Sequence, residues 1–178
     1  ELNPQYSSIQ DDLVGKVILS YTLNNLPKSN YVTQLNFFGS SYHYAENLRY
    51  QVINPNLNFY FRTDDFRSNK RHVLALYFYS VKRDKSPDPI GNPNYELVNL
   101  RYRYSNRGAL KHFSLGSNFQ YSKKFGKIDL TLDFRKLMSN GSQFSARLFA
   151  GKFLYHNQQQ TNFFDFNLNR PRDYLFRY

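Results

Sequence analysis

The chain has 178 residues, and its 24 Lys and Arg outnumber its 13 Asp and Glu, so its formal net charge is +11. The lack of Cys excludes a disulfide framework and thiolate metal sites, and the aromatic content of 19% is unlike that of a disordered chain. The sequence has no run of about 18 apolar residues, so no transmembrane helix is predicted. No signal segment opens the chain, so an exported protein with this start is expected to be processed or to be part of a longer chain.

Apolar and polar residues alternate along most of the chain, as in strands whose side chains point to opposite faces at each step. Residues 1–12 are polar and lack a period, which predicts a loop or a frayed end. Strands are predicted at residues 16–22, 31–38, 48–53, 57–62, 71–82, 95–105, 110–121 and 127–136, followed by a hairpin of two strands within residues 143–169.

Gly, Pro and Asn mark the connections between these strands. The sequence predicts a break at Gly39 to Ser41, a tight turn at Asn54-Pro55-Asn56, a long Pro-rich loop over residues 83–94 and a hairpin turn at Ser139 to Ser142. Short links between roughly ten strands favour an antiparallel meander. Strands of about ten residues are longer than the soluble average of five or six and suit a tilted membrane strand.

The predicted fold is therefore all-β: an antiparallel up-and-down meander that forms a transmembrane β-barrel or part of one. It is expected to occupy residues 1–178 as a single barrel domain or barrel fragment. A sheet in lipid must close because its open edges cannot face acyl chains. The low mean hydropathy of −0.69 fits such a barrel, whose strands alternate apolar and polar residues.

Two groups of side chains are candidates for function. Arg101, Arg103, Arg135 and Arg147 fall in polar rows and could form a basic lumen; the plainer interpretation is that they pair across strands with Glu96, Asp129, Asp133 and Asp165. Tyr102, Tyr104, Tyr121 and Tyr155 lie near predicted strand ends, as in an aromatic girdle at a bilayer interface. The alternative for the tyrosines is the aromatic core of a soluble sandwich.

Catalytic and metal-binding signatures are missing from the sequence. The four His residues have no His-x-x-x-His spacing. Asp129 and Asp133 would be about 13 Å apart along one strand face, too far for a paired acid and base. We therefore expect no catalytic, cofactor or metal site in this stretch. Nucleic acid is an unlikely partner because the basic residues are scattered and form no run of five.

Several sequence segments resemble those of a known protein family. They are Phe61-Arg62, the run from Phe66 to Arg71, the run from Asn92 to Tyr95, the run from Arg147 to Tyr155, and the run from Asn169 to Tyr178. From about Asn54 to the end they resemble the C-terminal region of Bacteroidetes M1-like (gluzincin) zinc metallopeptidases. The resemblance implies an outer-membrane barrel region attached to an exported peptidase, whose zinc and catalytic residues would lie in a separate domain.

Three functions follow as hypotheses. The first is a structural or anchoring barrel segment in the bacterial outer membrane, with membrane lipid and other envelope proteins as partners. The second is a pore or solute channel with an electropositive lumen. The third is a soluble β-sandwich that binds an acidic partner.

Overall fold

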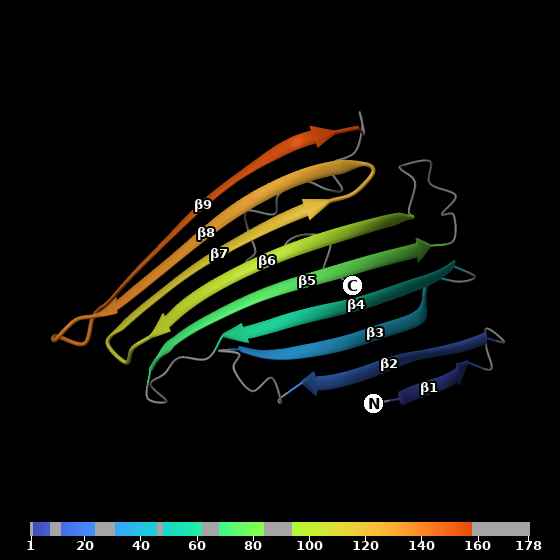
Figure 1. Ribbon diagram of the computed structural model, residues 1–178, viewed down its shortest axis with the longest axis horizontal. Helices are drawn as coiled ribbons and strands as arrows, with labels where there is room; N and C mark the ends of the chain where they lie inside the picture. The colour runs from blue at the N-terminus through green and yellow to red at the C-terminus, as the bar shows by residue number, and fades with distance from the viewer. Residues whose placement is uncertain are drawn as a thin grey trace.

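In the computed structural model, residues 2–7, 12–23, 31–45, 48–61, 68–83 and 94–157 are described, and they form nine antiparallel strands in one sheet. Each strand pairs with its neighbours in sequence, so the predicted all-β antiparallel meander is confirmed (Figure 1). The strands are β1 Leu2–Ser7, β2 Asp12–Leu23, β3 Tyr31–Ala45, β4 Leu48–Phe61, β5 Lys70–Arg83, β6 Tyr95–Arg107, β7 Lys111–Tyr121, β8 Phe125–Leu137 and β9 Gln143–His156. No helix that could span a membrane occurs in the described residues.

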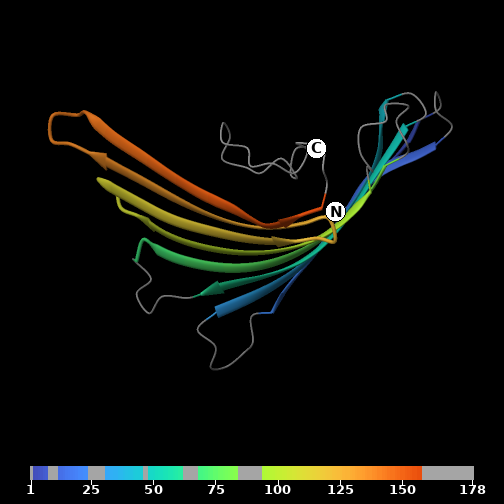
Figure 2. The same cartoon turned by 90° about the horizontal axis from the view of Figure 1, so that it is seen from above.

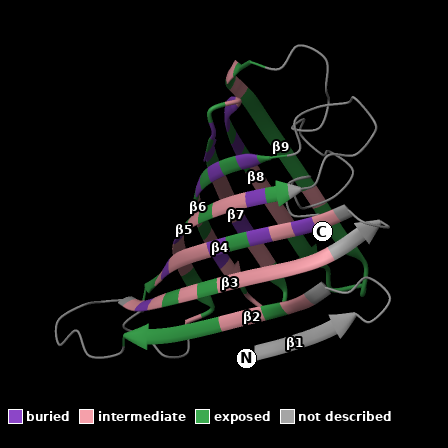
Figure 3. Cartoon of the chain, turned by 90° about the vertical axis from the view of Figure 1, so that its right-hand side faces the viewer, coloured by how far each residue is buried: buried purple, intermediate pink, exposed green. Residues whose placement is uncertain are grey.

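The sheet is open, with β1 at one edge and β9 at the other. It is strongly curved along its strands (Figure 2) and twists from β1 to β9 (Figure 3). From β2 to β9 every strand has 11 to 15 residues. Such lengths are about twice the soluble average and suffice to cross a bilayer when tilted.

The predicted turn at Asn54-Pro55-Asn56 is wrong, because β4 runs through it without a break. Pro55 has no N–H for the sheet ladder, and pairing between β4 and β5 is interrupted between Ile53 and Asn56. The register on either side places Phe78 opposite Pro55. The side chain of Asn54 donates to the Phe78 carbonyl oxygen at 2.9 Å, so a side-chain amide compensates for the N–H that proline lacks.

Two further expectations are corrected near the N-terminal edge. Residues 2–7 form β1, where a loop or frayed end was predicted, and Pro4 is tolerated because β1 is an edge strand. The predicted break at Gly39 to Ser41 is also wrong. All three residues continue β3, paired with β2 on one side and β4 on the other.

The connections near the C-terminal edge agree better with the sequence. The hairpin turn between β8 and β9 is present, and Gly141 has the positive φ of 79° that such turns require. The first strand of the hairpin predicted over residues 143–169 is β9. Its second strand, and the Pro-rich loop apart from Arg83 and Asn94, lie outside the described residues.

Candidate functional site

One face of the sheet carries most of its exposed large hydrophobic side chains, and we call it the apolar face. The strand registers place the following residues on this face: Leu19, Tyr21, Leu35, Phe37, Ile53, Phe61, Leu76, Phe78, Val98, Leu100, Phe119, Tyr121, Ile128, Leu130, Phe144 and Leu148. Their exposed fractions run from 37% to 68%. Tyr60, Leu137 and Phe149 are exposed on the opposite face. A surface of this kind, continuous over eight strands, is rare on a soluble monomer.

Lysines bound the apolar face at both ends. Lys70 and Lys82 stand twelve residues apart at the two ends of β5, and Lys124 and Lys136 have the same separation along β8 and the turn before it. Twelve residues span roughly 40 Å along a strand, or about 30 Å across a bilayer for a strand tilted by about 40°. Burial lowers the pKa of Lys124, whose Nζ donates to the Asn94 carbonyl oxygen at 2.8 Å. Lys152 of β9 departs from the pattern, since it lies on the apolar face opposite Ile128.

The four candidate interface tyrosines all lie on the apolar face. Tyr102 and Tyr104 of β6 contact His72 from the neighbouring strand, and the Tyr102 hydroxyl is 2.9 Å from its Nδ1. Tyr121 and Tyr155 form an edge-to-face pair toward the opposite end of the sheet, with ring centroids 6.1 Å apart. Tyr121 and Tyr155 therefore lie toward one end of this face and Tyr104 toward the other, whereas Tyr102 lies in the same cross-strand row as Leu130.

Tyr155 reaches this face only through a β-bulge. Simple alternation puts Tyr155 in the same row as Phe153 and Arg147. The register between β8 and β9 shifts between Gly126 and Lys127, which leaves one extra residue in β9 and turns Tyr155 to the other side. Its hydroxyl then donates to the carbonyl oxygen of Ser122.

The opposite face carries most of the buried polar side chains, and we call it the polar face. Polar side chains with 7% exposure or less on this face are Asn54, Asn58, Asn99, Ser105, Ser114, Gln120, Lys127 and Asp129. Asparagines connect β3 and β4 along it: Asn36 Nδ2 donates to Asn56 Oδ1 at 3.0 Å, and Asn58 Nδ2 donates to the same oxygen at 2.8 Å. Polar groups inside and apolar groups outside reverse the usual arrangement of a soluble sheet.

The predicted basic residues share the polar face, but they do not form one uniform row. Arg101 Nε donates to Asn118 Oδ1 at 2.8 Å, and Asn118 Nδ2 donates to Asp129 Oδ1 at 2.7 Å. Asn118 thus links Arg101 to the carboxylate two strands away. The guanidinium of Arg101 also lies 5.4 Å from the ring centroid of Tyr77.

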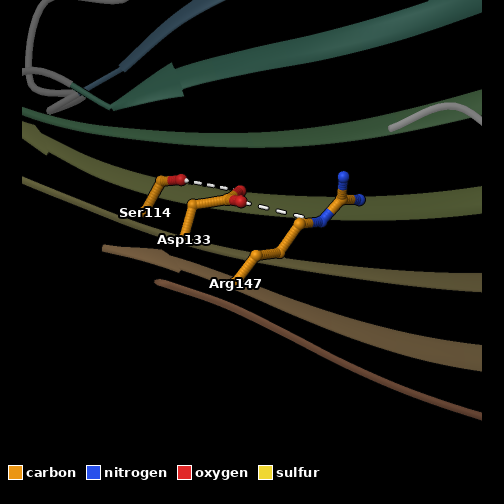
Figure 4. Close-up of polar contacts among 3 residues, drawn as sticks. All are labelled: Ser114, Asp133 and Arg147. Carbon is orange, nitrogen blue, oxygen red and sulfur yellow. Dashed lines mark hydrogen bonds and ion pairs between the residues drawn. The ribbon is translucent and has the colours of Figure 1, made fainter. Parts of the chain in front are cut away.

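Arg147 and Arg135 lie closer to the other end of the polar face. Arg147 Nε is 3.7 Å from Asp133 Oδ1, and Ser114 Oγ donates to Asp133 Oδ2 at 3.4 Å (Figure 4). The expected cross-strand pairing is therefore observed for Arg147 with Asp133. Glu96 faces the apolar side, away from Arg101 and Arg103, and Asp165 lies outside the described residues.

Two neighbours of these arginines, Arg107 and His112, were not among the predicted basic residues. Arg107 is opposite His112, and His112 is opposite Arg135, so the three form a row across β6, β7 and β8. Together with Asp133 and Arg147 they line a cavity of about 660 Å³. His112 alternates in step with Ser114 within the predicted strand 110–121, which places it on this face, whereas Arg107 falls just beyond the predicted strand 95–105, in step with Arg103.

The far end of the polar face is apolar instead. Tyr50, Val52, Val81, Tyr95, Leu97 and Phe125 form a buried cluster there. Lys127, with no exposed surface, lies against this cluster, its Nζ 5.4 Å from the ring centroid of Phe125 and 5.8 Å from that of Phe153. The polar face is thus packed with aromatic side chains at one end and open and basic at the other.

No family model, curated protein or solved structure matches this chain. Among the residues that the structure describes, no group of three or more His, Cys, Asp or Glu side chains is arranged to hold a metal ion.

Proposed function

We propose that this sheet is part of the wall of a β-barrel in a bacterial outer membrane, where its role is structural or anchoring. The observation that carries the proposal is the reversal of its two faces. Leucine, phenylalanine and tyrosine are exposed on one face, while Asn99, Gln120 and Lys127 are almost fully buried on the other.

Lipid explains this reversal better than water does. Acyl chains cover an apolar outer surface without cost, and lumen-facing polar groups can then pair with one another. In water, the exposed leucines and phenylalanines across β2 to β9 would remain hydrated or promote association. The lysines that bracket β5 and β8 support the same interpretation, since Lys side chains reach toward headgroups from the ends of a membrane segment.

We propose further that the barrel belongs to a larger exported protein or envelope complex of the metallopeptidase type. This part rests on the resemblance of the sequence phrases to Bacteroidetes M1-like metallopeptidases. Any zinc site and peptidase activity would then reside in a separate domain. Sequencing of the full gene product tests this directly: a His-Glu-x-x-His motif upstream would support it, and its absence would oppose it.

Single-cysteine scanning tests the membrane proposal, because the native chain has no Cys and offers a clean background. Ile128, Asp129, Leu130 and Thr131 would be replaced by Cys one at a time, in protein refolded into phosphatidylcholine vesicles. Polarity-sensitive labels at residues 128 and 130 should report an apolar environment, whereas labels at 129 and 131 should report a polar one. Equal signals at all four positions, or a monodisperse monomer without detergent that is retained on heparin, would favour the soluble alternative.

The shared face of Arg101, Arg103, Arg135 and Arg147 favours a second candidate function, a pore with anion preference. Planar bilayer conductance distinguishes it from an anchor. An anion-selective current that falls when Arg135 is replaced by Gln would support the pore. A silent bilayer, from protein shown to be inserted by the cysteine scan, would leave the structural role.

A further inference from the structure

Four basic side chains meet at the open end of the polar face, and we call them the basic cluster: Arg107, His112, Arg135 and Arg147. Side chains directly opposite on neighbouring strands have Cβ atoms about 5 Å apart. Arg107, His112 and Arg135 follow one another in this way, and Arg147 is one step further along β9, opposite Asp133. Arginine side chains at these positions can converge on one small group.

The basic cluster carries more positive than negative charge. Asp133 is its one carboxylate among the described residues that line the cavity. Asp133 contacts Arg147 through Nε alone, and the two side chains are 43% and 39% exposed, so this ion pair is weak. The terminal guanidinium nitrogens of Arg147 point away from Asp133 and are oriented by it (Figure 4).

Within the described part of the chain, the side chains of Arg107 and Arg135 make no hydrogen bond or ion pair. The two guanidinium groups thus bring up to ten N–H donors to one wall of the cavity. The cavity of about 660 Å³ is large enough for a phosphate together with the small molecule that carries it.

We propose that the basic cluster binds a phosphate group. Guanidinium groups match phosphate oxygens in pairs and do so more strongly than neutral donors. A tetrahedral phosphate can accept from Arg107, Arg135 and Arg147 on three sides, while a planar carboxylate could satisfy only part of that set. The site follows from the geometry of the polar face and not from membrane insertion, so it can hold or fail independently of the barrel proposal.

Isothermal titration with inorganic phosphate, at constant ionic strength and in zwitterionic detergent, tests the site. Replacing Arg107 and Arg135 together by Gln should weaken binding by about a hundredfold or more, since each of the two lost charge-assisted bonds is worth about tenfold or more. The matched control replaces Lys111 and Lys136 by Gln. It removes the same charge at the same end of the sheet, but on the apolar face, and should change the dissociation constant by less than about twofold.

A third variant tests whether the loss of binding reflects misfolding. Replacing Arg107 and Arg135 by Lys keeps the charge but removes the paired donors, so its affinity should fall between the other two while far-UV circular dichroism stays unchanged. If replacing Lys111 and Lys136 by Gln weakens binding as much as replacing Arg107 and Arg135 by Gln, the effect comes from overall charge and the proposed site is wrong. The absence of any saturable heat of binding in the native protein would also overturn the site.

The source of the phosphate is resolved by competition. Micelles containing phosphatidic acid are compared with micelles of zwitterionic lipid alone, both titrated with inorganic phosphate. If phosphatidic acid lowers the apparent affinity for phosphate, the basic cluster binds a lipid headgroup at the membrane surface. If it does not, the cluster serves a soluble phosphate compound in the lumen.

Discussion

Replacing Leu130 by Arg tests whether the apolar face of the sheet contacts lipid or water. Leu130 lies on the apolar face of β8 with 46% exposure. It is six residues from Lys124 and six from Lys136, or roughly 20 Å along the strand from each. The proposed barrel therefore puts Leu130 near the bilayer midplane.

The two environments predict different costs. In water, a charge at a half-exposed surface position usually changes the free energy of unfolding by about 0.5 kcal/mol or less. At the midplane of a membrane barrel, Arg on the lipid face costs about 2–4 kcal/mol, and the cost falls to about 0–1 kcal/mol near the interface. Phe134 lies on the same face two alternate positions nearer Lys136, so Arg there should cost less than Arg at residue 130.

Urea-induced unfolding from phosphatidylcholine vesicles, followed by circular dichroism, measures these free energies. Leu130→Ala serves as the reference for losing the leucine, so the difference between Arg and Ala isolates the charge. Thr131→Arg places the same charge on the polar face of the same strand and should cost much less. The reasoning is refuted if Leu130→Arg is no more destabilising than Leu130→Ala, or if Arg at 130 and 131 cost the same.

Three packing predictions can be checked in the same unfolding assay. Asn54→Ala should cost about 1–3 kcal/mol because the Phe78 carbonyl oxygen loses its donor, and adding Pro55→Ala should recover part of this by restoring an N–H; no recovery would contradict the compensation argued here. Tyr155→Phe should cost about 0.5–1.5 kcal/mol through its lost hydrogen bond to the β7–β8 turn. Gly126→Ala should cost about 1–3 kcal/mol, because its Cβ would lie 2.5 Å from Cε1 of Tyr155, and a neutral result would show that this ring moves freely.

Alternation alone predicted the strands from Tyr95 onward well. In β6 and β8 the apolar and polar rows differ at nearly every step, as with Val98 and Leu100 against Asn99 and Arg101, so both the strand and its faces could be predicted. The polar row was correctly assigned as one face. The hydrogen-bond partners of the residues in this row could not be predicted, because they depend on the strand register. The link from Arg101 through Asn118 to Asp129, for example, joins three strands.

Local turn signals failed where the sheet overrode them. Asn54-Pro55-Asn56 is a strong turn sequence, but β3 pairs with all three residues and holds them extended. Where the ladder to β5 is interrupted, the Asn54 side chain supplies a hydrogen bond to that strand. The bulge that turns Tyr155 was equally invisible. One extra residue in β9 changes the face of everything after it, and no residue type in that strand marks the position.

The packing of the polar face bears on the choice between wall and pore. A wide water-filled channel needs hydrated side chains along its whole length, but at one end of this face Leu97 and Phe125 are almost fully buried in an aromatic cluster. Lys127 is buried beside them, over the rings of Phe125 and Phe153. Among the described residues of β6 to β8, this face is most exposed at the end that holds Arg107 and Arg135. A cavity that an anion enters from one side fits this arrangement better than an open channel does. Such a cavity is compatible with a structural barrel that conducts little current.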